Sequence, residues 1–405
     1  MSFADRPSRR STAASLAADS RGASEVLGVI LAFGLVLSVL TVVQVTAVPV
    51  WVADAENGHS ETLRGQVVDL DEAVLRAGLT GVEGRQRLDL SPTYSARFAF
   101  VTPPPAAGTV STTTPANLTI SNARATGAAS GYWDGSDRTF ETSRIEASVP
   151  YHRFDDRPTH VIEGGTVFTR HATDAETVVH HAAVNGNRLT LVAVDGELDV
   201  STTGDETVTV TGASVGAEPI QVVSADGSSP IVVELPTGLS EASWREAVDG
   251  EPRATIPADG YRVVGGQAFV TLELPATDDD GDLLSYQLRL AKVGVGTGWT
   301  AESPAYLVPA VGNGSAVPAG GSQQVVVEVR DRFNNPVPGA TVTHTEPGTG
   351  DVTVVGSAQT DADGRVTLRY DATDPVGGPT DVSFDVGVST PGVDDLTITL
   401  EVRNP

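Results

Sequence analysis

The hydrophobic and polar positions divide this chain into one long apolar segment near the N-terminus and many short alternating runs after it. From Val26 to Ala53 no residue is charged. These 28 positions span about 42 Å as a helix, at ~1.5 Å per residue, and about 20 apolar residues suffice to cross a bilayer. We therefore expect a transmembrane helix over residues 23–58, preceded by a basic leader over residues 1–22.

The charges on either side of the apolar segment predict its orientation. Four arginines precede it, and an acidic sequence that begins at Asp54 follows it. Because positive charge is retained on the cytoplasmic side, the N-terminus is expected in the cytoplasm and residues 54–405 outside the cell. Trp51 stands near the outer end, where an interfacial aromatic residue is expected. The alternative is cleavage at Ala53-Asp54-Ala55, which imitates a signal-peptidase site and would release the rest of the chain.

A second, amphipathic helix is predicted over residues 59–84. Its apolar residues recur at spacings of 4, 3 and 4, as one helical face requires; they are Leu63, Val67, Leu70 and Val74. Pro49 and Gly58 precede it, so we expect a break between the two helices.

From residue 85 to residue 310 the pattern changes to short period-two runs rich in β-branched residues, which predicts antiparallel strands. The clearest runs begin at Arg188, Thr207, Ile231, Phe269 and Tyr286. Asn185-Gly186, Asp195-Gly196 and Asp226-Gly227 predict hairpin turns, and Ser240 begins one short helix. The fold class is therefore mainly β, with an N-terminal transmembrane helix and an antiparallel β-rich extracellular domain. The pattern does not decide whether residues 85–310 form one domain or two.

Residues 311–405 are expected to form a separate unit that opens with a Gly/Ser-rich segment, 312–322, whose composition is that of a linker. A strand pattern from Gln324 is followed by Asn-Asn-Pro-Val-Pro-Gly up to Gly339, and then by Thr360-Asp-Ala-Asp-Gly before the next strand. This arrangement is similar to the bacterial Ig-like domains of the invasin and intimin type. The resemblance implies a C-terminal Ig-like β-sandwich, a fold that serves as a spacer as often as a binding module.

The start of the apolar segment, Arg21-Gly-Ala-Ser-Glu25 followed by Val-Leu-Gly-Val-Ile30, resembles the class III signal of archaeal type IV pilin-like proteins. The resemblance implies that a prepilin-type peptidase cleaves near Arg21, Gly22 and Ala23 and leaves the apolar helix on the product. Glu25 is the third residue after Gly22, whereas the family usually has its acidic residue at the fifth position. The alternative is a signal anchor that is not processed.

The composition indicates the kind of environment in which the protein functions. The chain has 52 acidic and 26 basic residues, a net charge of −26, a single lysine at Lys292 and no cysteine. Dispersed carboxylates with little lysine favour a halophilic protein over an ordinary acidic one. The negative field excludes nonspecific nucleic-acid binding. The lack of cysteine excludes disulfide scaffolds, thiol catalysis and lipidated anchoring. Pieces of residues 20–305, such as Val161-Ile-Glu-Gly-Gly-Thr-Val, also resemble an uncharacterised family of haloarchaeal membrane-anchored surface proteins.

Two motifs have the residue types of a catalytic or a zinc site, but the sequence around each favours a structural interpretation. Gly212-Ala-Ser214-Val-Gly216 has the nucleophile-elbow spacing, but a strand pattern follows it instead of a helix, so a turn is expected. His171, His180 and His181, with Asp174 and Glu176, supply zinc-ligand chemistry. Adjacent histidines on a strand point to opposite faces, which favours solvated strand residues.

Acidic and asparagine motifs give candidate calcium and modification sites. Asp278, Asp279, Asp280 and Asp282 surround a glycine turn, and their oxygens suit calcium, with a solvated acidic turn as the alternative. Asp361-Ala-Asp-Gly364 is expected to be a hairpin turn of the Ig-like unit. Asn117 and Asn313 stand in N-glycosylation triplets on expected loops.

These features favour a non-enzymatic structural or adhesive protein of the cell surface, pilin-like or part of the cell envelope. The expected partners are the membrane, a prepilin-type peptidase, and pilin-like subunits, cell-envelope proteins or glycans. No cofactor is expected apart from the candidate calcium. The alternative is a membrane-tethered extracellular hydrolase that uses residues 85–310.

Overall fold

A computed structural model describes residues 19–97, 100–173, 176–181, 183–373 and 378–403. It has two compact units. The first comprises the described parts of residues 1–58, 92–105 and 151–155, and the second comprises those of residues 59–91, 106–150 and 156–405. The fold class predicted from the sequence is confirmed, because the structure is mostly β with one long apolar N-terminal helix and sandwiched sheets.

The N-terminal part is a single helix, α1, over Asp19–Thr80, with Pro49 inside it. The expected break at Pro49 and Gly58 is wrong. A proline removes one backbone hydrogen bond and costs about 3 kcal/mol in a helix interior. The helix nevertheless continues through Pro49, where its neighbours Val48 and Val52 are buried. The helix ends at Thr80, where Gly81 has a φ of +72° and its N–H bonds to the carbonyl of Ala77.

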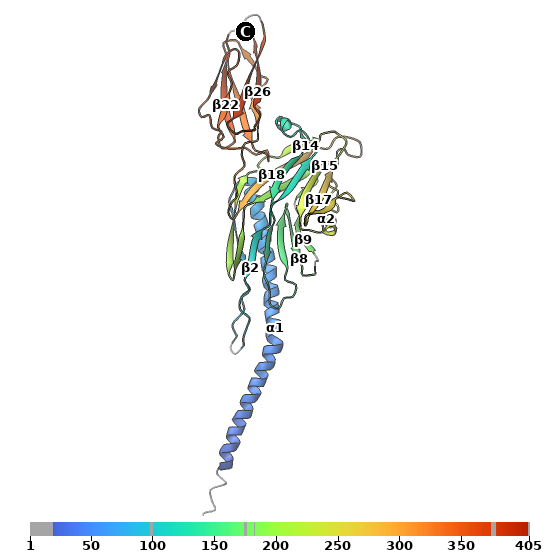
Figure 1. The fold of residues 1–405 in the computed structure, drawn as a ribbon, viewed down its shortest axis with the longest axis vertical. Helices are drawn as coiled ribbons and strands as arrows, with labels where there is room; N and C mark the ends of the chain where they lie inside the picture. The colour runs from blue at the N-terminus through green and yellow to red at the C-terminus, as the bar shows by residue number, and fades with distance from the viewer. Residues whose placement is uncertain (1–18, 98–99, 174–175, 182, 374–377, 404–405) are drawn as a thin grey trace, which may run out of the picture. The chain divides into compact units, whose positions relative to one another are not determined.

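The apolar face predicted for the last part of α1 is confirmed. Leu63, Val67, Leu70 and Val74 are each at most 3 % exposed. At Gly78 an added Cβ would lie 3.0 Å from Val192 and 3.2 Å from Ala291, so the helix backbone closely approaches two neighbouring strands. Residues 59–80 of α1 therefore form part of the core of the second unit (Figure 1).

Three sheets build the β-rich region of the second unit. Within the described residues the largest has seven strands: β1 (Gly84–Asp89), β13 (Asp205–Ser214), β18 (Tyr286–Val295), β11 (Arg188–Asp195), β10 (Val184–Asn185), β14 (Ile220–Ser224) and β4 (Ala123–Ala125). The next has six strands: β12 (Asp199–Thr202), β2 (Gly108–Thr112), β6 (Ile145–Ser148), β7 (Thr159–Glu163), β8 (Thr166–Arg170) and β9 (Glu176–His181). The third has five: β16 (Tyr261–Val264), β17 (Gln267–Leu274), β15 (Ile231–Thr237), β3 (Ala116–Ser121) and β5 (Arg138–Thr142).

One hydrophobic core joins the three sheets. Leu191 from the first sheet, Phe168 from the second and Val233 from the third belong to the same buried cluster. The short helices are η1 (Ala128–Gly131) and α2 (Glu241–Ala247). Ser240 caps α2 by accepting a hydrogen bond from the N–H of Ser243, as the sequence predicted.

The antiparallel expectation is wrong at the centre of the largest sheet. Strands β11 and β18 run parallel, with Leu191 opposite Leu290. Parallel neighbours need a crossover, and a long one separates these two strands in the sequence. Asn185-Gly186 does close the β10–β11 hairpin. Asp195-Gly196 and Asp226-Gly227 instead turn the chain from one sheet to another.

The C-terminal region is a sandwich of two four-stranded sheets within the described residues. One contains β19 (Tyr306–Val311), β21 (Ser322–Arg330), β24 (Arg365–Asp371) and β23 (Asp351–Val354). The other contains β20 (Ala316–Pro318), β26 (Leu396–Arg403), β25 (Thr380–Val388) and β22 (Val342–His344). The turn Asp361–Gly364 connects β23 to its antiparallel partner β24, as predicted.

The Gly/Ser-rich segment from Gly312 to Ser322 is not a linker between domains. It lies inside the sandwich, because β19 before it pairs with β21 and β20 within it pairs with β26. Glycine and serine are used here for turns, which composition alone does not distinguish from flexible connections. The sandwich therefore begins at Tyr306, before the predicted boundary at residue 311.

Candidate functional site

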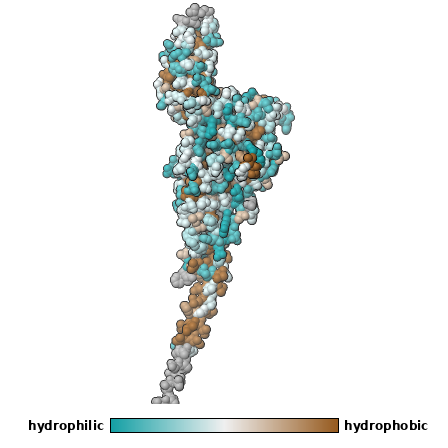
Figure 2. Space-filling view, viewed as in Figure 1, coloured by the Kyte–Doolittle hydropathy of each residue, from teal (hydrophilic) through white to brown (hydrophobic). Residues whose placement is uncertain are grey.

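The first half of α1 exposes a continuous apolar surface (Figure 2). Its large hydrophobic side chains between Val26 and Val45 are mostly 47–70 % exposed. By length and composition this part of the helix is able to cross a membrane, a property that an N-terminal signal sequence shares. An apolar surface of this length in water is unfavourable, so it requires an apolar environment.

The polar side chains within this apolar stretch are paired. The hydroxyls of Ser38, Thr41 and Thr46 each donate to the carbonyl four residues earlier, at 2.8 Å. The amide of Gln44 donates to the carbonyl of Val101 at 2.8 Å and accepts from the N–H of Val101 at 3.0 Å. Internal pairing of this kind is what polar groups need in a medium without water.

Further along α1, Glu56 joins three segments of the first unit. Its carboxylate accepts from the hydroxyl of Tyr94 at 2.5 Å and from the backbone N–H groups of His152, Arg153 and Phe154 at 2.7–2.9 Å. Burial alone would raise the pKa of Glu56, but these hydrogen bonds lower it below its ordinary value. The charged carboxylate therefore holds the segments 92–105 and 151–155 together with α1.

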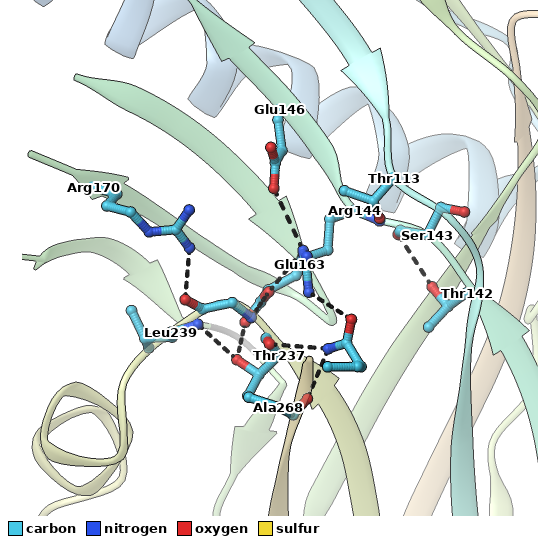
Figure 3. A network of polar contacts seen from close by, with 12 residues as sticks. Thr113, Thr142, Ser143, Arg144, Glu146, Glu163, Arg170, Thr237, Leu239 and Ala268 are labelled. Atoms are coloured by element: carbon cyan, nitrogen blue, oxygen red, sulfur yellow. Dashed lines mark hydrogen bonds and ion pairs between the residues drawn. The ribbon is translucent and has the colours of Figure 1, made fainter. Parts of the chain in front are cut away.

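A buried polar network lies between the second and third sheets (Figure 3). Glu163, at the end of β7, is hydrogen-bonded to the hydroxyl of Thr237 and accepts from the N–H of Gly238 at 2.7 Å. The guanidinium of Arg144 lies 3.8 Å from Glu163 and 3.6 Å from Glu146. Burial raises the pKa of Glu163, and the surrounding hydrogen bonds counter only part of that effect.

The space beside this network is too small for a substrate. Its volume is about 10 Å³, which is roughly one water molecule. The indole N–H of Trp244 donates to Thr237 at 2.7 Å, and Arg170 donates to the carbonyl of Gly238 at 2.6 Å. The network thus fixes the β15–α2 connection against β7, which is a structural role.

A second buried network joins the β-rich domain to the Ig-like sandwich. Ser214 donates to Asp331 at 2.6 Å, and Asn335 donates to Ser214 at 2.7 Å and to the carbonyl of Leu290 at 2.9 Å. The other oxygen of Asp331 accepts from the N–H groups of Phe333 and Asn335, both at 2.9 Å. Burial raises the pKa of Asp331 to about 6.

Aromatic and ionic contacts extend this interdomain joint. Tyr132 stacks on Tyr306 with the ring centroids 4.3 Å apart, and Phe140 packs on Phe333 at 4.6 Å. The only lysine of the chain, Lys292, is buried between Asp195 at 2.8 Å and Glu302 at 2.9 Å. Arg332 of the sandwich also bonds to Glu302, at 2.9 Å. The sandwich is therefore held to the preceding domain by packing and by paired charges.

The remaining motifs separate into structural turns and exposed sites. Ser214 is buried in the joint at the end of β13, and the chain passes from Gly216 toward β14, so it is not a nucleophile elbow. The carboxylate of Asp278 accepts from the N–H groups of Asp280 and Asp282 and closes its own turn.

The described residues contain no group of three or more His, Asp or Glu side chains placed to hold a metal ion. The candidate calcium site at Asp278, Asp279, Asp280 and Asp282 stays a prediction from the sequence. His171 instead pairs with Asp156 at 2.5 Å. Asp174 and the side chains of His180 and His181 lie outside the described residues.

The modification sites lie on the surface or at the beginning of α1. Asn313 is exposed on a turn, as expected, and its carbonyl oxygen accepts from the N–H of Thr399 at 3.0 Å. Asn117 is exposed, but it lies on strand β3 and not on a loop. Arg21, Gly22 and Ala23 belong to the first turns of α1.

Sequence reasoning missed Glu56, Glu163 and Asp331 as organising groups. Each has partners distant in the chain, which local spacing does not reveal. For Asp331 the available signal was the Asp-Arg-Phe-Asn-Asn-Pro sequence of the Ig-like resemblance, which did mark the turn that forms the joint.

The comparisons with known proteins identify solved structures with related folds but assign the chain to no family. No protein-family model and no curated protein matches this chain. The D00-D0 domain of intimin is 12 % identical and aligns over 45 % of this chain and 91 % of its own, with a TM-score of 0.23. Domains 1–6 of the surface-layer protein SbsC are 10 % identical over 71 % of this chain and 50 % of their own, with a TM-score of 0.22. The Yersinia pseudotuberculosis adhesin InvE is 14 % identical over 48 % and 54 %, with a TM-score of 0.19. Similarity at this level concerns the fold alone.

Proposed function

We propose that this chain is a non-enzymatic surface protein that α1 anchors in the membrane and that presents the β-rich domain and the Ig-like sandwich outside the cell, in a structural or adhesive role. The observation that carries the proposal is the exposed apolar half of α1, in which Ser38, Thr41, Gln44 and Thr46 are all paired. Such a surface suits a lipid environment and is unfavourable in water.

The interdomain joint supports presentation as the role of the outer part. The contacts of Asp331 and the stacking of Tyr132 on Tyr306 restrict hinge motion between the β-rich domain and the sandwich. A fixed sandwich suits a spacer or a binding module that is held away from the membrane. Its partners, in this proposal, are pilin-like subunits, cell-envelope proteins or glycans.

The processing of the anchor is pilin-like in this proposal. A prepilin-type peptidase removes the leader near Gly22 and leaves the apolar helix attached to the ectodomain. The orientation follows from the arginine-rich leader and the acidic ectodomain, with the N-terminus in the cytoplasm. The acidity of the ectodomain fits a halophilic environment.

Membrane extraction tests the anchor. The double variant Leu35→Arg/Val39→Arg places two charges on exposed apolar positions of α1, and Val263→Arg places a charge on an exposed strand residue as the matched control. One arginine at the centre of a spanning helix costs about 2.5–3.5 kcal/mol. We expect the native chain and V263R to remain with washed membranes and the double variant to lose membrane association. Recovery of the native chain in the soluble fraction with its apolar segment intact would refute the proposal.

A further inference from the structure

The pairing of Gln44 with Val101 marks a place where a second segment lies along the apolar part of α1. Both groups of the Gln44 amide bond to the backbone of Val101, 57 positions away. Without this partner, the side chain of Gln44 and the backbone of Val101 would each have unsatisfied polar groups in lipid, at several kcal/mol each. The two satisfy one another, while the side chain of Val101 is 77 % exposed.

The position of Gln44 along α1 corresponds to the outer edge of the hydrocarbon. If the bilayer core begins at Val26, the first residue after Glu25, about 20 residues of helix cross ~30 Å and end near Val45. Trp51 then lies about 9 Å further out, at ~1.5 Å per residue, in the headgroup region. On this placement of the bilayer, Val101 lies at the boundary between hydrocarbon and headgroups.

The chemistry around Val101 suits that boundary. The guanidinium of Arg97 is exposed and lies 4.0 Å from the ring centroid of Trp51, and Phe100 packs edge-on against the same ring at 6.1 Å. Aromatic rings with a cation beside them are typical of the headgroup level, where the cation meets lipid phosphate. The carbonyl of Pro104 contacts the ring of His152 at 3.1 Å, which ties the far end of the segment to the first unit.

Resting on the proposed membrane anchor, we propose that Arg97 together with Phe100–Pro104, the contact loop, is a second membrane contact whose partner is the outer leaflet. The side chains of Phe100 and Val101 enter the hydrocarbon boundary, and Arg97 lies among the lipid phosphates. A shallow cleft of about 170 Å³ is lined by Trp51, Arg97 and Phe100, among others, and is open to a headgroup. The contact loop fixes the depth and the rotation of α1, which one helix alone leaves free.

Site-directed spin labelling tests this proposal in the full chain, which contains no cysteine of its own. Single variants Val101→Cys, Val36→Cys and Val263→Cys are labelled and reconstituted in vesicles of equal parts phosphatidylglycerol and phosphatidylcholine. Oxygen partitions into lipid and a nickel chelate remains in water, so the ratio of the two accessibilities reports depth. We expect the ratio at V101C to lie between the high value at V36C and the low value at V263C.

The same measurement separates this inference from the proposed function. A water-like ratio at V101C with a lipid-like ratio at V36C overturns the contact loop and leaves the anchor intact. A water-like ratio at V36C overturns both.

A second pair of variants tests whether Gln44 holds the loop. Gln44→Leu removes both hydrogen bonds to Val101, whereas Thr46→Val removes a bond that lies within α1 and serves as the control. We expect Gln44→Leu to shift the ratio at V101C toward that at V263C and Thr46→Val to leave it unchanged. An unchanged ratio in Gln44→Leu would show that the pairing does not position the loop.

Discussion

Replacing Asp331 by asparagine is expected to change how the stability of the chain depends on pH. Asp331 is 2 % exposed, and burial raises its pKa from 3.8 to about 6 despite the hydrogen bonds from Ser214, Phe333 and Asn335. A raised carboxyl pKa means that the folded state favours the protonated form. The difference between these two pKa values corresponds to about 3 kcal/mol of stability, at ~1.4 kcal/mol per pKa unit.

The sign follows from proton linkage. Below pH 3.8 the group is protonated in both states and carries no penalty. As pH rises from about 4 to about 6, the unfolded chain ionises first, and the native chain loses stability relative to the variant. Between pH 4.5 and pH 7.5 this relative loss amounts to about 2 kcal/mol. The other carboxylates contribute almost equally to both proteins, so the comparison isolates Asp331.

Denaturant unfolding of the native chain and Asp331→Asn, followed by tryptophan fluorescence in detergent micelles at high salt, measures this difference. Trp133 and Trp244 are buried and report on the core that the joint contacts. Asp361→Asn, on an exposed turn, is the matched control for the loss of one carboxylate at the surface. If the stability difference between native chain and D331N is the same at pH 4.5 and pH 7.5, the carboxylate of Asp331 is not held in the environment described here.

Three further predictions follow from the same description. Residues 54–405 contain 49 acidic and 22 basic side chains, and we expect circular dichroism of the full chain to show loss of its β structure as salt falls from molar to millimolar; a melting temperature indifferent to salt would contradict the halophilic interpretation. Ser214→Ala removes the hydroxyl that donates to Asp331, so the free energy of unfolding in high salt should be about 1–3 kcal/mol lower than that of the native chain. An unchanged free energy of unfolding would show that Ser214 does not stabilise the joint. N-terminal sequencing of membrane-bound protein should begin within a few residues of Gly22; a start beyond Ala53 would indicate release, and an intact N-terminus would indicate an unprocessed anchor.

Local patterns predicted the individual elements well. The runs that begin at Arg188, Ile231 and Tyr286 are strands, and the helical face through Leu63 and Leu70 is buried. These predictions rest on the spacing of hydrophobic residues, because the backbone geometry of a helix or a strand determines which residues share a face. The apolar segment was also evident from the sequence, because its length and lack of charge are local properties.

Long-range relations were not accessible in this way. The sequence of β11 does not show that its neighbour is the parallel strand β18. The hydrophobic pattern of each strand indicates that it is a strand, but it does not identify the partner or the direction of pairing. Gly312–Ser322 has the composition of a linker, but its turns are fixed by β19 and β20 on either side. Pro49 lies inside α1, although the sequence predicted a break there. The prediction considered only the proline itself and could not take account of the burial of Val48 and Val52.

Three buried carboxylates have a shared arrangement that bears on why this chain keeps them. Glu56, Glu163 and Asp331 each accept hydrogen bonds from a segment far away in the sequence: residues 152–154, the β15–α2 connection and the end of β13, respectively. Burying a carboxylate costs free energy that an apolar residue of similar size would not. What the carboxylate adds is direction, since an N–H or O–H donor must meet it at one position, whereas apolar contacts tolerate sliding.

The chain has few aromatic residues, 5 % of the total, and its cores consist mainly of Val, Leu and Ala, which specify position weakly. We infer that the buried carboxylates select one arrangement of the segments at some cost in stability. Replacement of one of these carboxylates alone by an apolar residue of similar size would leave its buried N–H and O–H donors without an acceptor. We therefore expect the free energy of unfolding to fall by about 1–3 kcal/mol per orphaned donor and the joint to be less well fixed. For a protein proposed to present a module at a set position outside the membrane, a fixed arrangement matters more than the last few kcal/mol of stability.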